Sequence, residues 1–101
     1  MSERSERLAQ ALRERLGAVH VEVVDESHLH AGHAGAEGGG GHFRALVVSD
    51  RFEGLSRVAA QRLVYASLEE ELASWIHALA LRTVPASQWP DGGGASDAGA
   101  G

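Results

Sequence analysis

A change in the spacing of apolar residues near the start of the chain constrains its fold most. Leucine recurs at every fourth position over residues 8–16, which predicts an amphipathic helix with one narrow buried face. Valine then recurs at every second position over residues 19–23, with polar residues between, which predicts a strand that ends at Asp25. Gly17 separates the two patterns and suits the left-handed residue that often ends a helix. The chain is therefore predicted to pass from helix to strand within a few residues.

A second alternating run over residues 43–48 predicts another strand. Consecutive strands usually pair, so an antiparallel hairpin with the first strand is expected. The connection between them, residues 26–41, is long for a hairpin and is rich in glycine and histidine. Loops of more than about 12–15 residues usually carry a function or are disordered. Both alternatives stay open for this segment.

Two further helices are predicted after the hairpin. The first follows a turn at Gly54 and ends near residues 65–66, and its buried side is predicted to comprise Leu55, Val58, Ala59 and Leu63. The second begins at a capping box formed by Ser67 and Glu70, with acidic residues at the positive end of the helix dipole. Its buried stripe is predicted to comprise Leu68, Leu72, Trp75 and Ile76.

The last elements complete the expected architecture. Residues 78–84 read as a mostly apolar strand, and residues 85–89 as a short turn of helix. The fold class is α+β with the order α-β-β-α-α-β and a short C-terminal helix. We expect a three-stranded mixed sheet with its main helices on one face. Residues 1–90 form one domain, and residues 91–101 form a disordered tail rich in Gly, Ala and Asp.

The residue types that the chain lacks exclude several chemistries. It has no Cys, which rules out disulfides, thiol nucleophiles and any self-contained iron–sulfur or zinc–thiolate site. It has no Lys, which rules out Schiff-base chemistry. A net charge of −5 with neutral His argues against generic nucleic-acid binding. No set of nucleophile, base and orienting group is recognisable, so we expect a protein that is not an enzyme.

The sequence also predicts where the protein works. No apolar run approaches the roughly 20 residues that span a bilayer, and the charged N-terminus lacks the apolar core of a signal peptide. We therefore expect a cytoplasmic protein with no membrane partner.

Histidine is the residue type that stands out. The chain has six, of which four fall within residues 28–42. A flexible loop could bring any two of His28, His30 and His33 to one metal ion, and the alternative is a solvated loop that binds metals weakly. His42 lies within reach of this loop, and a solvent-facing position at a strand end is favoured for it over metal binding. His77 follows the last predicted helix, so it is expected near the surface, either as a ligand or as a C-terminal cap of that helix.

Three stretches of the chain resemble the BolA family over residues 5–89. They are VEVVDESHLHAGHAG, HFRALVVSDRFEGLSRVAAQRLVY and LEEELASWIHALALRTVPASQW. Within them the family's order and spacing are kept by Phe52-x-Gly54, Arg62-x-Val64-Tyr65 and His77-Ala78-Leu79. The resemblance implies a fold like the type II KH domain. It also implies work with monothiol glutaredoxins in iron–sulfur cluster assembly, transfer or iron regulation.

The resemblance implies a shared metal site. His77 corresponds to the histidine that is thought to bind cluster iron, and a loop residue, His30 with His33 as its close competitor, would be the second ligand. Imidazole binds iron well, but a [2Fe–2S] cluster needs four ligands and this chain has no thiol. The resemblance supplies the other two as the active-site Cys of a glutaredoxin and the thiolate of a bound glutathione. The lack of Cys thus argues for a partner.

Some members of the family are also linked to DNA and to stress-dependent control of transcription and morphology. That alternative would use the helix-turn-helix-like segment 52–76, in which only Arg57 and Arg62 are basic. The family's basic-His-basic triplet reads Ala60-Gln61-Arg62 here, a departure that weakens the nucleic-acid role more than the fold.

Two further residues of this segment are candidates for binding a partner. Gly54 precedes a helix N-terminus that could bind an anion, with a plain turn as the alternative. Arg62 and Tyr65 would suit a protein interface equally well. Whether the free protein forms a homodimer stays open.

Overall fold

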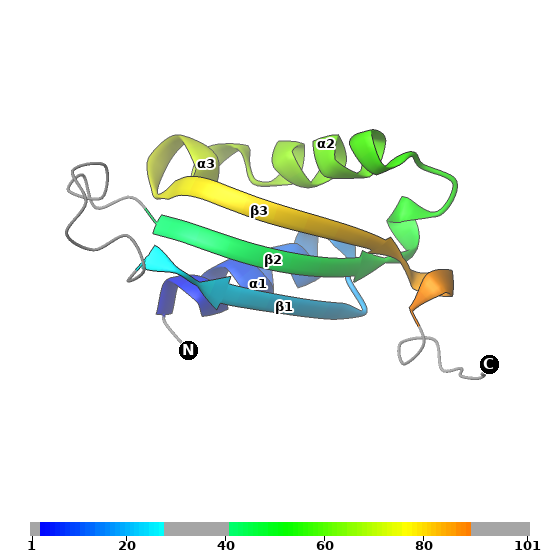
Figure 1. The fold of residues 1–101 in the computed structure, drawn as a ribbon, viewed down its shortest axis with the longest axis horizontal. Helices are drawn as coiled ribbons and strands as arrows, with labels where there is room; N and C mark the ends of the chain where they lie inside the picture. Colours follow the sequence, from blue (N-terminus) through cyan, green and yellow to red (C-terminus); the bar gives the residue numbers. More distant parts are fainter. Residues whose placement is uncertain (1–2, 28–40, 90–101) are drawn as a thin grey trace.

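The computed structural model describes residues 3–27 and 41–89 (Figure 1). Its elements are α1 (Glu3–Leu16), β1 (His20–Asp25), β2 (Gly41–Ser49), the 3-10 turn η3 (Asp50–Phe52), α2 (Arg57–Ser67), α3 (Glu69–Ser74), β3 (Ile76–Pro85) and the 3-10 turn η4 (Ala86–Gln88). The predicted tail, 91–101, lies outside the described residues, and so do His28, His30 and His33.

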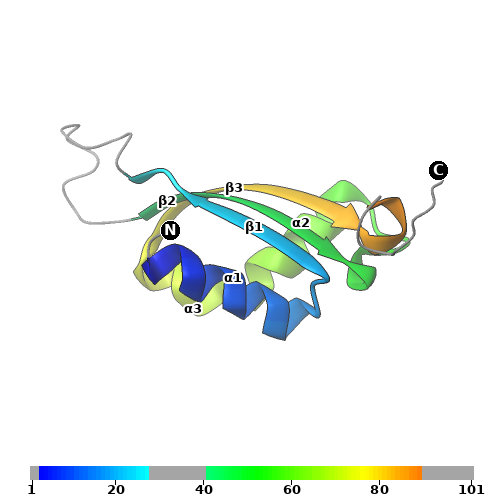
Figure 2. The same ribbon diagram turned by 90° about the horizontal axis from the view of Figure 1, so that it is seen from below.

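The sheet has the order β1-β2-β3. β1 pairs with β2 in antiparallel fashion and β3 pairs with β2 in parallel fashion. Figure 2 shows the three helices on the same side of this sheet. The predicted α+β class, element order and mixed sheet are therefore confirmed. No helix within the described residues is long and apolar enough to span a bilayer.

The core lies between the helices and the sheet. Leu8, Leu12 and Leu16 are at most 1% exposed, and they pack with Phe43 and Val47 from the helix side of β2. The predicted four-residue stripe is thus the buried face of α1. Gly17 has a φ of +59°, so the helix ends on a left-handed residue, as the sequence predicts.

The buried face of α2 differs from the prediction. Leu55 and Val58 are 40% and 57% exposed, whereas Ala60 and Val64 are buried. The helix begins only at Arg57. Ser56 is its N-cap, and the Ser56 side chain accepts a hydrogen bond from the backbone N–H of Ala59. The prediction holds for Leu63, which is half-buried and packs against the core, and fails for Leu55 and Val58. Contact with the rest of the core turns the buried face of α2 toward Ala60 and Val64.

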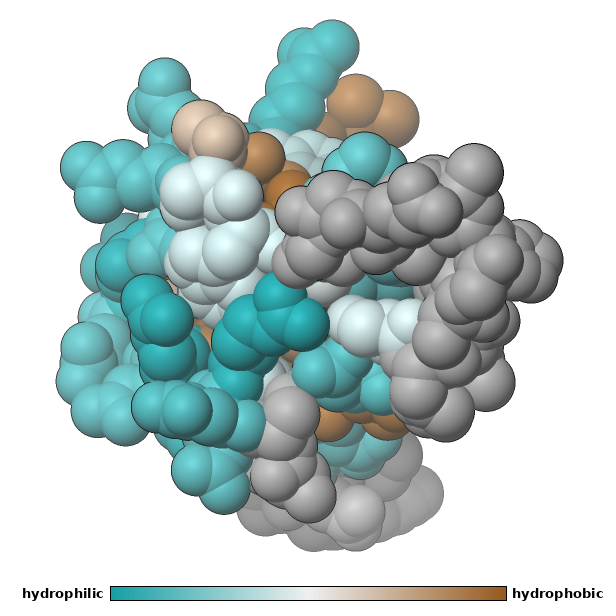
Figure 3. Space-filling model, turned by 90° about the vertical axis from the view of Figure 1, so that its left-hand side faces the viewer, coloured by the Kyte–Doolittle hydropathy of each residue, from teal (hydrophilic) through white to brown (hydrophobic). Residues whose placement is uncertain are grey.

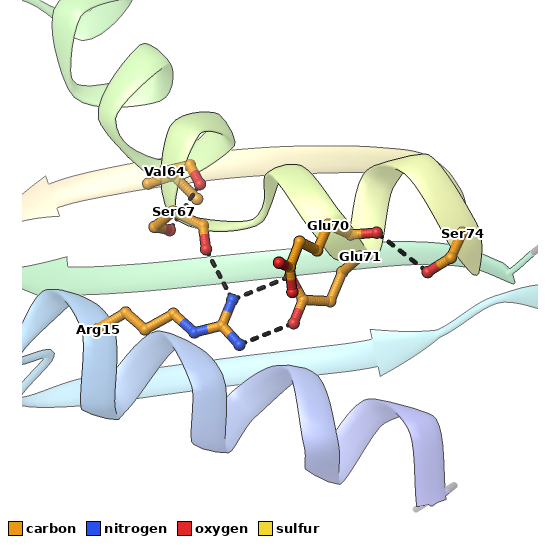
Figure 4. Close-up of polar contacts among 6 residues, drawn as sticks. All are labelled: Arg15, Val64, Ser67, Glu70, Glu71 and Ser74. Carbon is orange, nitrogen blue, oxygen red and sulfur yellow. Dashed lines mark hydrogen bonds and ion pairs between the residues drawn. The ribbon is translucent and has the colours of Figure 1, made fainter.

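The predicted capping box is also wrong (Figure 4). Ser67 is the last residue of α2, and its hydroxyl donates to the carbonyl of Val64 at 2.7 Å. Leu68 separates α2 from α3 and makes no side-chain cap. Its own N–H donates to carbonyls of α2, so the two helices follow each other with almost no break. α3 is only six residues long and ends at Ser74, before the predicted end of the helix.

An ion pair joins the first and third helices. The Arg15 guanidinium donates to both carboxylate oxygens of Glu71, at 2.9 and 2.8 Å, and to the carbonyl of Ser67 at 2.7 Å (Figure 4). The hydrogen bonds from Arg15 lower the pKa of the Glu71 carboxyl from its ordinary value. This pair fixes α3, and with it the start of β3, against α1.

The Glu71 contact predicts a pH-dependent stability. Because the folded pKa lies below that of the unfolded chain, the stabilisation is present above the unfolded pKa and is lost as pH falls through the folded one. We expect Glu71→Gln to lower the Tm at pH 7, and the difference from wild type to close in strongly acidic buffer. Thermal unfolding at several pH values measures this. Glu69→Gln is the matched control, because Glu69 is an exposed neighbour on the same helix. A Tm difference between Glu71→Gln and wild type that persists at low pH would contradict the prediction.

Candidate functional site

A β-bulge sets the geometry at one end of the sheet. Gly41 pairs with Ile76 and His42 pairs with Ala78, so His77 is the extra residue that has no partner across the ladder. Bulges re-aim side chains and often lie next to functional sites. His77 is the second residue of β3, and it is exposed.

The His77 ring lies beside a second imidazole. Its centroid is 5.1 Å from that of His42, with 45° between the ring planes. His42 is half-buried, and its Nε2 atom is buried. The expectation that His42 faces solvent is therefore wrong. Its position beside His77 depends on a strand more than 30 residues further along the chain, so local spacing could not reveal it.

The two ends of the undescribed histidine-bearing connection meet at this pair. The His42 backbone N–H donates to the Ser27 hydroxyl at 3.0 Å, and its carbonyl accepts from the N–H of Glu26 at 2.7 Å. The chain therefore leaves the described structure at Ser27 and returns at Gly41, directly beside the histidine pair. Figure 3 views this end of the molecule, where the described surface is mostly hydrophilic.

An aromatic layer supports the bulge from the core side. The rings of Phe43 and Trp75 meet edge to face, with centroids 5.7 Å apart, and the Gly41 N–H donates to the Trp75 carbonyl at 2.9 Å. The guanidinium of Arg7 lies 4.9 Å from the centre of the Trp75 ring. Edge-to-face and cation–π contacts of this kind hold rings in defined orientations. The start of β3 is thus fixed from below, while His77 remains open to solvent.

This arrangement can offer imidazole nitrogen to a metal that another molecule brings. Within residues 3–27 and 41–89 no group of three or more potential ligand side chains forms a complete metal site. Imidazole is a suitable ligand for iron, and the exposed His77 can be reached by a partner. The described residues therefore fit the role of a partial ligand set.

The predicted partner-binding residues of α2 lie apart from the histidine pair. Gly54 has a φ of +76° and follows η3, as a turn glycine should. Arg57 lines a hollow that is also lined by Val84, near the far end of β3. Arg62 is exposed, and the Tyr65 hydroxyl donates to the Leu79 carbonyl at 3.5 Å. The structure does not bring Gly54 or Arg57 to His77.

The fold and this site define a small α+β domain that presents histidine at one end of a mixed sheet. A family model described as BolA-like protein matches residues 12–88. The DNA-binding transcriptional regulator BolA of Escherichia coli is 43% identical over 84 residues, which cover 83% of this chain and 77% of that protein. BolA-like protein 1 of Bos taurus is 46% identical over 74 residues, 73% of this chain and 55% of that protein.

A solved structure agrees with the sequence comparisons. The BolA domain of SufE1 from Arabidopsis thaliana superposes with a TM-score of 0.74 at 37% identity, and covers 88% of this chain and 99% of that one. The chain belongs to the BolA family.

Proposed function

We propose that the chain is a cytoplasmic accessory protein, not an enzyme, in iron–sulfur cluster assembly, transfer or iron regulation. It docks on a monothiol glutaredoxin and lends two imidazoles to a shared [2Fe–2S] cluster, one from His77 and one from His30 or His33. The glutaredoxin Cys and glutathione supply the two thiolates. One observation carries the proposal: His77 is exposed on a bulge at the point where the histidine-bearing connection leaves and rejoins the sheet.

The absence of Cys supports the need for a partner. A [2Fe–2S] cluster needs four ligands, and this chain contributes only nitrogen. Histidine ligation raises the reduction potential of such a cluster relative to ligation by thiolates alone. The shared cluster should therefore be easier to reduce and more labile than the one in the glutaredoxin alone, which suits transfer or iron sensing.

The direct test is to titrate the chain into cluster-loaded monothiol glutaredoxin. Visible absorption and circular dichroism report the ligands of the iron, so both spectra should change until the two proteins are equimolar. The apo glutaredoxin mixed with the chain gives the spectral baseline. Spectra that stay equal to the sum of the separate proteins would overturn the proposal.

The choice between the two loop histidines has its own expected outcome. We expect His30→Ala to weaken the titration by more than about 100-fold, as loss of an iron ligand should, and His33→Ala to leave it within a few-fold of wild type. The same visible titration measures both variants. The reverse result would assign the second ligand to His33, and no effect in either variant or in the double variant would remove this connection from the site.

A second candidate is a DNA-binding transcriptional regulator of stress response and morphology. The observation that favours it is the 43% identity to the DNA-binding transcriptional regulator BolA of Escherichia coli. It would use segment 52–76, although three glutamates occupy the first turn of α3. We expect sequence-selective retardation of DNA that Arg62→Ala weakens. Binding that disappears by about 0.2 M salt without sequence preference would mean charge attraction only.

A further inference from the structure

The outer edge of β3 is free over a short stretch. His42 directs its N–H and C=O toward β1, so alternate residues of β2 from Phe43 onward direct theirs toward β3. Their partners in register, Leu79, Leu81 and Thr83, therefore direct N–H and C=O away from the sheet. The hydrogen bond from a tyrosine of α2 to the Leu79 carbonyl agrees with this direction.

Unlike Leu79, whose carbonyl accepts from Tyr65, Leu81 and Thr83 have backbone groups that no side chain covers with a hydrogen bond in the described part of the chain. In the described part of the chain, no hydrogen bond from outside the sheet reaches either residue. Edge groups of this kind are a template for the backbone of another extended segment. The free edge is bounded by Tyr65 on one side and by η4 on the other.

A polar hollow of about 530 Å³ lies along this edge, between β3 and the start of α2. Its lining side chains come from both elements and from η4: Arg57, Gln61, Leu81, Arg82, Thr83, Val84 and Gln88. Neither guanidinium makes a hydrogen bond or ion pair within residues 3–27 and 41–89. The carboxylate of Glu53, which is close in the fold, already accepts from the N–H and hydroxyl of Ser87 at 2.8 Å. No acidic side chain lines the hollow, so its lining carries the positive charge of two arginines, although the whole chain carries a net charge of −5.

We propose that this hollow, a groove between α2 and the outer edge of β3, binds an extended acidic peptide segment of a partner protein as an added strand. The outward N–H and C=O groups of Leu81 and Thr83 would pair with the peptide backbone. Arg57 stands on the helix side of the edge. Arg82 pairs in register with Leu46 on the opposite face from the core. Successive side chains of a strand alternate between faces, so two adjacent acidic residues would meet one arginine each.

A peptide fits this edge better than a nucleic-acid backbone. The edge offers both donors and acceptors, and a peptide backbone supplies the complement of both, whereas a phosphodiester backbone only accepts. Bound phosphates would leave the outward carbonyls of Leu81 and Thr83 without donors. The groove is at the opposite end of β3 from His77, so it can be tested independently of cluster binding.

The probe is a fluorescein-labelled hexapeptide, Thr-Val-Glu-Glu-Val-Thr, with blocked ends. We expect saturable binding to the whole chain by fluorescence anisotropy. Replacement of both Glu by Gln, or Arg57→Ala combined with Arg82→Ala, should weaken it by about 10-fold or more. Arg13→Ala is the matched control, because Arg13 is exposed on α1 near the other edge of the sheet. A peptide with alternate amides N-methylated should not bind. In amide hydrogen exchange, the N–H groups of Leu81 and Thr83 should gain protection when the unmodified peptide is added.

Three results would overturn the proposal. The first is no saturable binding of the acidic peptide up to about 1 mM. The second is equal binding of the N-methylated peptide, which would mean charge attraction without strand pairing. The third is a single-stranded DNA decamer that binds more tightly than the peptide and loses affinity in the same double variant, which would assign the groove to nucleic acid. The experiments that compare the acidic, amide-substituted and N-methylated peptides use the wild-type chain, so they do not depend on the folding of any variant.

Discussion

Replacing His77 with alanine is expected to abolish the spectral change that the chain is proposed to cause in a cluster-loaded glutaredoxin. The side chain is exposed and stands on a bulge, so its removal takes away the proposed iron ligand and leaves the buried core intact. Loss of a residue that merely supports a metal ligand typically costs about 10–100-fold in metal affinity. Loss of the ligand itself should cost more, so half-saturation should move by more than about 100-fold.

His20→Ala is the matched control for this experiment. It also removes an imidazole from the sheet, but His20 pairs with Val48 at the far end and stacks on Trp89 at 4.7 Å. Its titration should equal that of wild type. If His77→Ala gives the same titration as wild type, and its far-ultraviolet circular dichroism spectrum is unchanged, His77 is not an iron ligand.

His77→Cys provides a second readout that loss of structure would not produce. A thiolate at this position keeps a ligand for iron, so the shared cluster should still form. Because replacing thiolate by histidine raises the reduction potential, the variant should lower it relative to wild type. An unchanged potential would place the iron ligands elsewhere.

Gly41→Ala is expected to destabilise the fold strongly. A Cβ at this position would overlap Cε2 and Cζ of the Phe43 ring and would lie 3.2 Å from the Trp75 carbonyl oxygen. The ring cannot move away freely, because it is 2% exposed and packs edge to face on Trp75. Overpacking of a core costs about 1–3 kcal/mol, and we expect the upper part of that range. For a domain of this size the Tm should fall by about 10–20 °C.

Two comparisons isolate the cause of that effect. Gly54→Ala meets no atom within 4 Å and carries only the strain of a φ of +76°, so it should cost about 1–2 kcal/mol. Phe43→Leu in the Gly41→Ala background should recover part of the loss, so that the double variant costs less than the sum of the two single variants. Strict additivity, or a wild-type Tm for Gly41→Ala, would contradict the proposed overlap. Calorimetry or denaturant unfolding measures all four variants against wild type.

The elements could be predicted because local spacing decides them. The leucine stripe of α1, the left-handed Gly17 and the alternating runs of β1 and β2 all depend on neighbours within a few residues. Prediction failed where two local patterns competed. The segment before Tyr65 carries two apolar stripes, and only packing against α1 and β3 buries Ala60 and Val64 in place of Val58.

The candidate site was predictable only in part. Composition made histidine the candidate ligand type, and element order placed His77 near the surface, where the structure has it. The position of His42 beside His77 was missed. The only local sign was its neighbour Gly41, which lets the Phe43 ring lie close to the backbone. The ligand roles of His30 and His33 stay predictions, because both lie outside the described residues.

The sequence by itself determined the order of helices and strands, the lack of thiol ligands and the presence of histidine in a long connection, since each is a property of residue type or short-range spacing. Only the tertiary structure decided that the ends of this connection meet beside the pair of His42 and His77, and that Arg15 of α1 holds Glu71 of α3. It alone also decided that the outer edge of β3 lies next to two arginines. These contacts join residues that are far apart in the chain, and the free energy of burying one common core brings them together.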